Sequence, residues 1–340
     1  METDGFEGWT KVLGRLAAGA DLTSAESRGA LAEVLAGGAT SAQLAAFIVA
    51  LRLKGETAEE ITGLVEAMVA VAAPLRLPAG AIDIVGTGGS PTLRDRAFNV
   101  STVASIVAAA AGATVCKHGN RMASSTSGST DVLEQLGVAV DLDGAGVERC
   151  IEAAGVGFCF ARMFHPAMRH VGPTRSELGI PTVFNILGPL SHPGGVTRQV
   201  LGVADPARVD VIAEVLHQRG MERAMVVHGH DGLDELTTTD RTLVIDIVDG
   251  EVSRREIDPA DVGLERRTGS ITPGKQADLM MIDCRGMNIF PALQGGNAAH
   301  IVVMYAESSD IENVMVAGRF AKRDGQLVFD EQRLRQLSQE

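Results

Sequence analysis

The sequence contains few of the residues that characterise secreted or disulfide-rich proteins. Its 340 residues include four cysteines, one tryptophan and one tyrosine. The cysteines form neither a CxxC pair nor a regular framework, and they are Cys116, Cys150, Cys159 and Cys284. We therefore expect reduced, buried thiols in a cytoplasmic protein rather than a fold held together by disulfides.

Long apolar runs and an excess of positive charge are also missing. The apolar run at 103–115 is too short to span a membrane and is rich in small residues, so it predicts a buried helix. The N-terminal stretch METDGFEGW is acidic and polar, which is not typical of a secretory signal peptide. A net charge of −13 argues against nucleic acid as a partner, although a site with local positive potential can still bind a small anion.

The apolar residues follow two patterns in turn. Residues 8–76 carry them at helical spacing, with a capping box at Thr57 and Glu60, and predict a small all-helical unit. From Ile82 onward short strands alternate with helices, which predicts an α/β domain with a parallel sheet. The expected strands are AIDIVGTGG, ATVCKHG, VGFCFA and AMVVHGH. Their carboxyl ends are where ligand-binding loops lie in such folds.

The last part of the chain has a different, β-rich character. The stretch IENVMVAGRFAKRDGQLVF predicts two strands around Gly318 and a second turn at Asp324-Gly325. The stretch GSITPGKQADLMMID predicts a further strand. This part therefore does not continue the strand–helix alternation of the middle of the chain.

The first strand runs into the loop GTGGSPTLRDRAFNVST at 86–102. Glycines without a Cβ atom allow backbone amides to approach an oxyanion closely. The amides and hydroxyls at the start of the next helix also favour phosphate. The residues of this predicted phosphate site are Gly86, Gly88, Gly89, Asn99, Ser101 and Thr102.

Two further motifs follow predicted strands. KHGNR at 117–121, followed by the hydroxyl-rich SSTSGST at 124–130, predicts a clamp for a diphosphate. Asp234 and Glu235 in DGLDE become Mg²⁺ ligands if they lie near such a diphosphate, because Mg²⁺ prefers one or two carboxylates together with phosphate oxygens.

One more stretch, HPAMRHVGPTRSELG, contributes a histidine and an arginine. A helix could carry both His165 and Arg175 towards the same pocket. The guanidinium of Arg175 can bind a carboxylate in bidentate fashion. On its own, each residue is equally consistent with an exposed cation on a helix surface.

Taken in order from about residue 10 to 264, these motifs resemble the anthranilate phosphoribosyltransferases. KHGNR together with HPAMRHV and FNILGPL is a specific combination. The resemblance implies a small helical domain joined to an α/β domain of the nucleoside phosphorylase and phosphoribosyltransferase type, usually as a homodimer. It implies transfer of phosphoribose from phosphoribosyl diphosphate to anthranilate, with release of pyrophosphate, in tryptophan biosynthesis.

The resemblance also assigns roles to individual residues. Lys117 faces the diphosphate, and we expect Lys117 and Arg175 to act in catalysis. Asn120, His165 and Arg175 hold the acceptor. The metal ligands are Ser101, Asp234 and Glu235, with Mg²⁺ as the expected cofactor. The other donor-binding residues are Gly86, Thr87, Gly88, Gly89, Asn99, Ser101, Thr102 and Ser129.

The sequence departs from the family pattern at two places near these motifs. Ser90 replaces an aspartate, and the loop from 90 to 98 is longer and carries Arg94 and Arg96. These arginines either contact the diphosphate or lie on a loop that folds outward; we expect retained binding with an altered loop. Pro181 replaces an arginine on the acceptor side, so the acceptor can differ from anthranilate.

The third departure is the end of the chain. Residues 268–328 resemble the accessory β-domain of amidohydrolases, without the barrel that carries their metal ligands. We expect this tail to cover apolar surface or to form an oligomer contact. The expected domains are 1–78, rejoined by about 166–190, then 79–264, and the tail at 265–340. Two alternatives stay open: another aromatic or N-heterocyclic acceptor, and a non-catalytic descendant that binds the donor or a partner protein.

Overall fold

The computed structural model describes two compact units of the chain. The larger unit contains residues 1–237 and 241–257, and the smaller contains 238–240 and 258–340. Within them the structure describes residues 5–88, 99–121, 128–261, 279–282, 311–316, 319–324 and 326–327. The predicted Gly89 and the lengthened loop with Ser90, Arg94 and Arg96 lie outside the described residues. No helix among the described residues has the length and apolar character to cross a bilayer.

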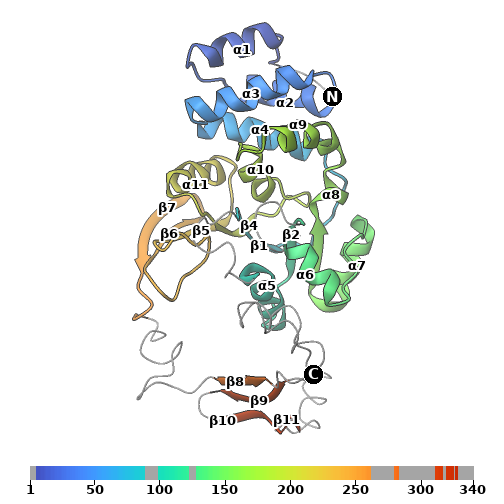
Figure 1. The fold of residues 1–340 in the computed structure, drawn as a ribbon, viewed down its shortest axis with the longest axis vertical. Helices are drawn as coiled ribbons and strands as arrows, with labels where there is room; N and C mark the ends of the chain where they lie inside the picture. Colours follow the sequence, from blue (N-terminus) through green and yellow to red (C-terminus); the bar gives the residue numbers. More distant parts are fainter. Residues whose placement is uncertain are drawn as a thin grey trace, which may run out of the picture. The chain divides into compact units, whose positions relative to one another are not determined.

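Four helices gather at one end of the larger unit (Figure 1). They are α1 (Trp9–Ala17), α2 (Ser24–Leu35), α3 (Ser41–Lys54) and α4 (Ala58–Ala70). Three of them begin with a capping box, in which a threonine hydroxyl and the third helical side chain satisfy each other's backbone N–H. The boxes are Thr23 with Glu26, Thr40 with Gln43, and Thr57 with Glu60. The box predicted at Thr57 is confirmed.

The helices are held together by one apolar core and one buried acid. Phe47, Ile48 and Leu64 are fully buried in a core that continues onto the sheet. Glu60 is also fully buried, and it accepts hydrogen bonds from the Leu22 N–H at 2.9 Å and from the Lys54 ammonium at 2.9 Å. Because a buried carboxylate needs such partners, Glu60 fixes the start of α4 against the end of α3.

A seven-stranded sheet forms the centre of the larger unit, with strand order β3-β2-β1-β4-β5-β6-β7. The first five strands in this order run parallel. The strands are β1 (Ile82–Gly86), β2 (Val115–Gly119), β3 (Val156–Phe160), β4 (Arg198–Gly202), β5 (Arg223–Gly229), β6 (Thr242–Val248) and β7 (Glu251–Ile257). The helices between them include α5 (Val100–Ala110), α6 (Ser129–Gln135), α7 (Gly144–Ala154) and α11 (Val209–Gln218).

The predicted parallel sheet is extended at one edge by an antiparallel hairpin. Strands β6 and β7 run antiparallel to their neighbours. They form a hairpin because Asp249 and Gly250 both adopt positive φ angles, 49° and 85°, as a two-residue turn of this kind requires. Six of the seven residues of β7 are exposed, and its charged side chains protect this edge from pairing with another chain.

The segment between β3 and β4 packs against the N-terminal helices. It contains α8 (Ala161–Phe164), the 3₁₀ helix η1 (Pro166–His170), α9 (Gly172–Leu178) and α10 (Phe184–Leu190). A second 3₁₀ helix, η2 (Pro206–Arg208), precedes α11. Contacts join η1 to α2, α9 to α3, and α10 to α4. The apolar residues Val171, Phe184 and Leu187 thereby enter the core of the helices.

The smaller unit contains a four-stranded antiparallel sheet with order β11-β10-β9-β8. Its strands are β8 (Leu279–Ile282), β9 (Ile311–Val316), β10 (Arg319–Arg323) and β11 (Gln326–Leu327). Strands β9 and β10 pair antiparallel, as do β10 and β11. Gly318 and Gly325, where the sequence predicts turns, lie outside the described residues.

Candidate active site

The lysine and the two acids predicted for the site lie together at the carboxyl ends of three parallel strands. The loop after β1, the end of β2 and the loop after β5 supply them, and the first turn of α5 faces the same place. The sheet order puts β1 between β2 and β4 and puts β5 beside β4. The chain order is therefore reversed next to β1, which is the position where open α/β sheets bind ligands.

Lys117 is the central cation of the site. Its side chain is 2% exposed, and its ammonium donates to the Ile84 carbonyl at 2.6 Å and to the Ser101 hydroxyl at 3.0 Å. Burial lowers the pKa of Lys117, and the charges of Asp83 and Glu235 oppose this shift. An ammonium has three donors, so two fixed bonds leave one N–H for a ligand.

Asp234 packs directly against two glycines, Gly86 and Gly202. Its Oδ2 atom accepts the Gly88 N–H at 2.7 Å. A Cβ atom on Gly86 would lie 2.3 Å from that Oδ2, and one on Gly202 would lie 1.7 Å from the Asp234 carbonyl oxygen. The absence of side chains at both positions is what allows the loop after β5 to reach the loop after β1. No sequence motif identifies Gly202, because its role depends on a residue in a distant loop.

Glu235 stands beside Asp234 in a partly buried position. Burial, followed by the neighbouring Asp234 charge, raises the pKa of Glu235 to about 7, while Lys117 and the Ser101 backbone act in the opposite direction. Two adjacent carboxylates and the Ser101 hydroxyl are hard oxygen donors of the kind that Mg²⁺ binds. A divalent cation would remove the repulsion that raises this pKa. These residues therefore fit the predicted metal site.

The remaining donor-side residues lie around this centre. The Thr87 N–H donates to the Gly202 carbonyl at 2.9 Å, and its hydroxyl accepts the Ala204 N–H at 3.1 Å, which fixes the loop after β1. The Ser129 hydroxyl, at the start of α6, lies 3.4 Å from the Asn120 carbonyl. Asn99 is the residue before α5, and Thr102 is 2% exposed.

A group of buried histidine rings includes His118 of KHGNR and the predicted acceptor residue His165. His165 is 4% exposed, and its ring centroid lies 5.3 Å from that of His118. Burial lowers the pKa of His165 to about 4, so its ring is neutral at pH 7. Neither ring nitrogen has a hydrogen-bond partner of normal geometry among the described residues. Burial, followed by the nearby His165, lowers the pKa of His118, from KHGNR, well below its ordinary value.

His165 and Arg175 do not lie on one helix, which corrects the interpretation of the sequence. His165 follows the last residue of α8, whereas Arg175 lies on α9. Pro166 is the first residue of η1 and Pro173 is the second residue of α9, because proline favours the first turn and interrupts a longer helix. The Arg175 guanidinium lies 5.4 Å from the centroid of the Phe184 ring, and it makes no ion pair with any described residue.

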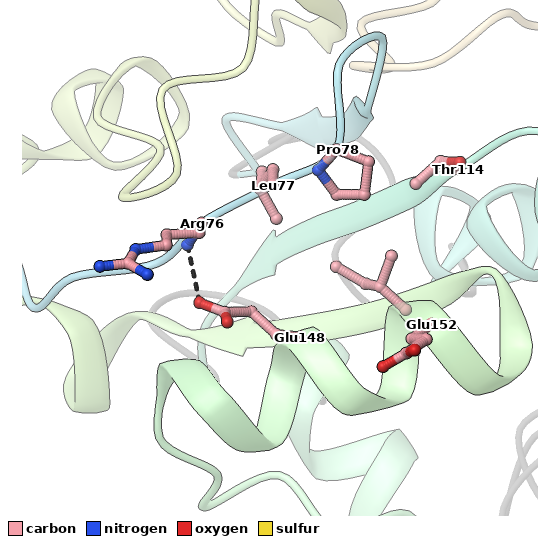
Figure 2. Close-up of a pocket in the computed structure, with 7 residues that line it drawn as sticks. Arg76, Leu77, Pro78, Thr114, Glu148 and Glu152 are labelled. Atoms are coloured by element: carbon pink, nitrogen blue, oxygen red, sulfur yellow. Dashed lines mark hydrogen bonds between the residues drawn. The ribbon is translucent and has the colours of Figure 1, made fainter.

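A separate hollow of about 420 Å³ lies at the opposite ends of the strands (Figure 2). Its lining includes Leu77, Pro78 and Thr114, and Thr114 immediately precedes β2. The Arg76 N–H donates to Glu148 at 2.9 Å beside it. None of the predicted site residues lines this hollow, so it is distinct from the candidate active site.

Comparison with known proteins agrees with this geometry. Residues 10–72 match the helical bundle domain of a glycosyl transferase family, and residues 79–290 match the α/β domain of the same family. The chain is 48% identical over 276 residues to the anthranilate phosphoribosyltransferase of Rhodopseudomonas palustris (strain BisB18), a match that covers 81% of this chain and 80% of the relative.

Solved structures give the same result. The anthranilate phosphoribosyltransferase of Thermus thermophilus superposes with a TM-score of 0.70 at 39% identity, covering 86% of this chain and 80% of that one. The Saccharomyces cerevisiae enzyme in complex with phosphoribosyl diphosphate and Mg superposes with a TM-score of 0.69 at 30% identity, covering 78% of each chain. With the strand-end site and these matches together, the chain belongs to the anthranilate phosphoribosyltransferases of this glycosyl transferase family.

Proposed function

We propose that the protein transfers the phosphoribosyl group of phosphoribosyl diphosphate to the amino group of anthranilate, releasing pyrophosphate, as a step of tryptophan biosynthesis. The contact between Lys117 and Ser101, beside Asp234 and Glu235, is the observation that carries this proposal. It places one buried cation and a pair of carboxylates at one end of the sheet, which suits a diphosphate bound together with a metal ion.

Lys117 binds the departing diphosphate through its remaining N–H. Its other two donors are held by Ile84 and Ser101, so the ammonium needs no reorganisation when negative charge develops on the leaving group. The bond to the leaving group breaks early in such transfers, and positive charge builds on the ribose ring. Anchoring of the leaving group is therefore the main contribution of this side of the site.

The metal ion would be held by Ser101, Asp234 and Glu235. Mg²⁺ supplies charge neutralisation of the diphosphate when it is bound there. On the protein side, the Gly88 N–H orients the Asp234 carboxylate, and close packing against Gly86 and Gly202 keeps this residue in place.

The acceptor is oriented by cationic and neutral groups. Arg175, which has no acidic partner among the described residues, binds the carboxylate of anthranilate, while Asn120 and the neutral His165 ring line the rest of its site. An aromatic amine is already a nucleophile, so the reaction requires no strong general base. Pro181 carries no charge, so this position on the acceptor side lacks a cation. The neighbouring Ile180 is exposed.

The direct test combines two signals. Purified protein is incubated with phosphoribosyl diphosphate, Mg²⁺ and anthranilate, and the loss of anthranilate fluorescence is followed together with pyrophosphate release. We expect both signals at equal rates. Pyrophosphate release only with another aromatic or N-heterocyclic acceptor would replace anthranilate by that acceptor. No binding of the donor in calorimetry would favour a non-catalytic protein.

The metal ligands are tested by removing charge without changing shape. The double variant Asp234→Asn with Glu235→Gln should lose Mg²⁺-dependent turnover and Mg²⁺-dependent binding of pyrophosphate. Asp205→Asn is a matched control, because Asp205 caps η2 with its side chain and an asparagine can do the same. Unchanged Mg²⁺ dependence in the double variant would remove both residues from the mechanism.

We further propose that the protein acts in the cytoplasm as a homodimer and has no nucleic-acid or membrane partner. The unpaired thiols of Cys116, Cys150 and Cys159 and the net charge of −13 support this setting. Light scattering coupled to size exclusion measures the oligomeric state, and a monomer over the working concentration range would contradict the dimer.

A further inference from the structure

The central sheet is joined unevenly on the two sides of β1. On one side β1 pairs with β4 through five residue pairs, from Ile82 to Gly86. On the other side it pairs with β2 through a single pair, Ile82 with Val115. Strand β2 itself pairs with β3 along its whole length. The backbone pairing between β1 and β2 is therefore confined to the first residue of each strand and does not reach the site.

Two side chains bridge the strands where this ladder ends. The Asp83 carboxylate of β1 accepts the His118 N–H of β2 at 3.0 Å. The Lys117 ammonium of β2 donates in the other direction, to the Ile84 carbonyl of β1 at 2.6 Å. A carboxylate and an ammonium thus replace the backbone hydrogen bonds that would otherwise continue a parallel ladder.

Asp83 is held from both sides. It is fully buried, and its second oxygen accepts the Gln199 side-chain amide of β4 at 3.0 Å. The same amide nitrogen donates to the Pro189 carbonyl at 2.8 Å. These bonds satisfy the carboxylate, which would otherwise be costly to bury, and fix its position across three strands.

A buried acid close to a diphosphate site requires a reason, since its charge repels the ligand. The reason lies in Lys117, which directly precedes His118. Holding the His118 N–H away from the β1 backbone keeps β2 apart from β1 and leaves the Ile84 carbonyl available to the Lys117 ammonium. Without the carboxylate, the His118 N–H would lack its partner and the two strands could close into an ordinary ladder.

We propose that Asp83 is a positioning residue for donor binding, which keeps β1 and β2 apart so that Lys117 presents its third N–H to the diphosphate. This proposal rests on the proposed function, because it concerns the same donor. Asp83 does not touch the ligand; it acts through the His118 peptide and the Lys117 side chain.

The test compares Asp83→Ala and Asp83→Asn in the full chain. Calorimetry gives the Kd of phosphoribosyl diphosphate with Mg²⁺, and steady-state kinetics give the KM of each substrate. We expect Asp83→Ala to raise the donor Kd and KM about tenfold or more, as for loss of a charge-assisted contact, with little change in the anthranilate KM. Asp83→Asn should lie between, because its amide oxygen can still accept the His118 N–H. Asp143→Asn, an exposed residue that caps α7, is the matched control for loss of one negative charge.

A second readout reports the contact itself. Hydrogen exchange of the His118 amide should accelerate in Asp83→Ala and remain slow in Asp143→Asn. A folded Asp83→Ala protein with wild-type donor Kd would overturn the proposal, as would unchanged His118 exchange. If Asp83→Ala does not fold, a wild-type donor KM in Asp83→Asn would overturn it. A wild-type protein that binds no donor would refute the proposed function instead, and the exchange experiment would still test the contact.

Discussion

The ammonium of Lys117 at the end of β2 and the hydroxyl of Ser101 in the first turn of α5 lie 3.0 Å apart. This contact joins two motifs that are separate in the sequence, the glycine-rich loop with its following helix and KHGNR. It also makes Lys117 a buried cation that is held in place before any ligand arrives.

Replacing Lys117 by methionine separates function from stability. We expect Lys117→Met to lower kcat/KM by about 10²-fold or more, because one preorganised charge on the leaving group is lost. We expect its melting temperature to fall only modestly, because relief of the buried charge partly offsets the loss of the donor to the Ile84 carbonyl. Calorimetric unfolding and steady-state kinetics check both parts. A large fall in melting temperature would show that the lysine is mainly structural.

The close contact between Gly202 and Asp234 predicts that a substitution at Gly202, which lies outside every recognised motif, weakens metal binding. In Gly202→Ala the new Cβ meets the Asp234 carbonyl at 1.7 Å, so the loop after β5 must move. We expect weaker Mg²⁺-dependent pyrophosphate binding and reduced turnover. Gly14→Ala is the control, because a Cβ there meets nothing within 4 Å and alanine favours a helix by about 0.5–1 kcal/mol. Wild-type metal affinity in Gly202→Ala would show that the packing of Asp234 against Gly202 does not support metal binding.

Arg175 predicts a defect confined to the acceptor. Arg175→Lys keeps the charge but loses the planar pair of donors that binds a carboxylate. We expect the KM for anthranilate to rise about tenfold, since a bidentate, charge-assisted contact is reduced to a single one. The Kd of phosphoribosyl diphosphate should stay within twofold of the wild type. An equal rise in the anthranilate KM and the donor Kd would show that Arg175 supports the fold as a whole rather than binding the acceptor.

His165 predicts a dependence of stability on pH. Its pKa is about 4 in the folded protein, below its ordinary value of 6.5, so protons bind preferentially to the unfolded chain as pH falls. The unfolding free energy should therefore decrease between pH 6.5 and pH 4, by up to about 3 kcal/mol from this residue. Urea denaturation of the wild type and of His165→Gln measures it. The variant should lose less stability than the wild type over this range, and equal losses would contradict the assignment.

Local sequence signals were sufficient for much of the fold. The helical unit, the strands ending at Gly86, Gly119 and Phe160, and the C-terminal strands follow from periodicity, glycines and caps. Strand β4 was not predicted, because RQVLG is short and begins with two polar residues. The β6–β7 hairpin was also missed, although Asp249-Gly250 is a turn signal that could have identified it.

The relationships that assemble the site were less accessible. KHGNR and DGLDE indicate a cation and two acids, but the contacts of Asp83 with His118 and of Gly202 with Asp234 depend on strand order. An aspartate within the apolar strand AIDIVG was the available signal for Asp83. Nothing local distinguishes Gly202 from a glycine in an ordinary strand.

The position of β1 between β2 and β4 also bears on how the enzyme matures. Its neighbour on one side follows closely in the chain, whereas its neighbour on the other begins at Arg198, and the acids come later still. A growing polypeptide that has left the ribosome only as far as β3 already contains the glycine loop and KHGNR, yet it lacks the strand that aligns them with the carboxylates. A nascent chain therefore lacks both predicted metal ligands until the DGLDE loop has left the ribosome.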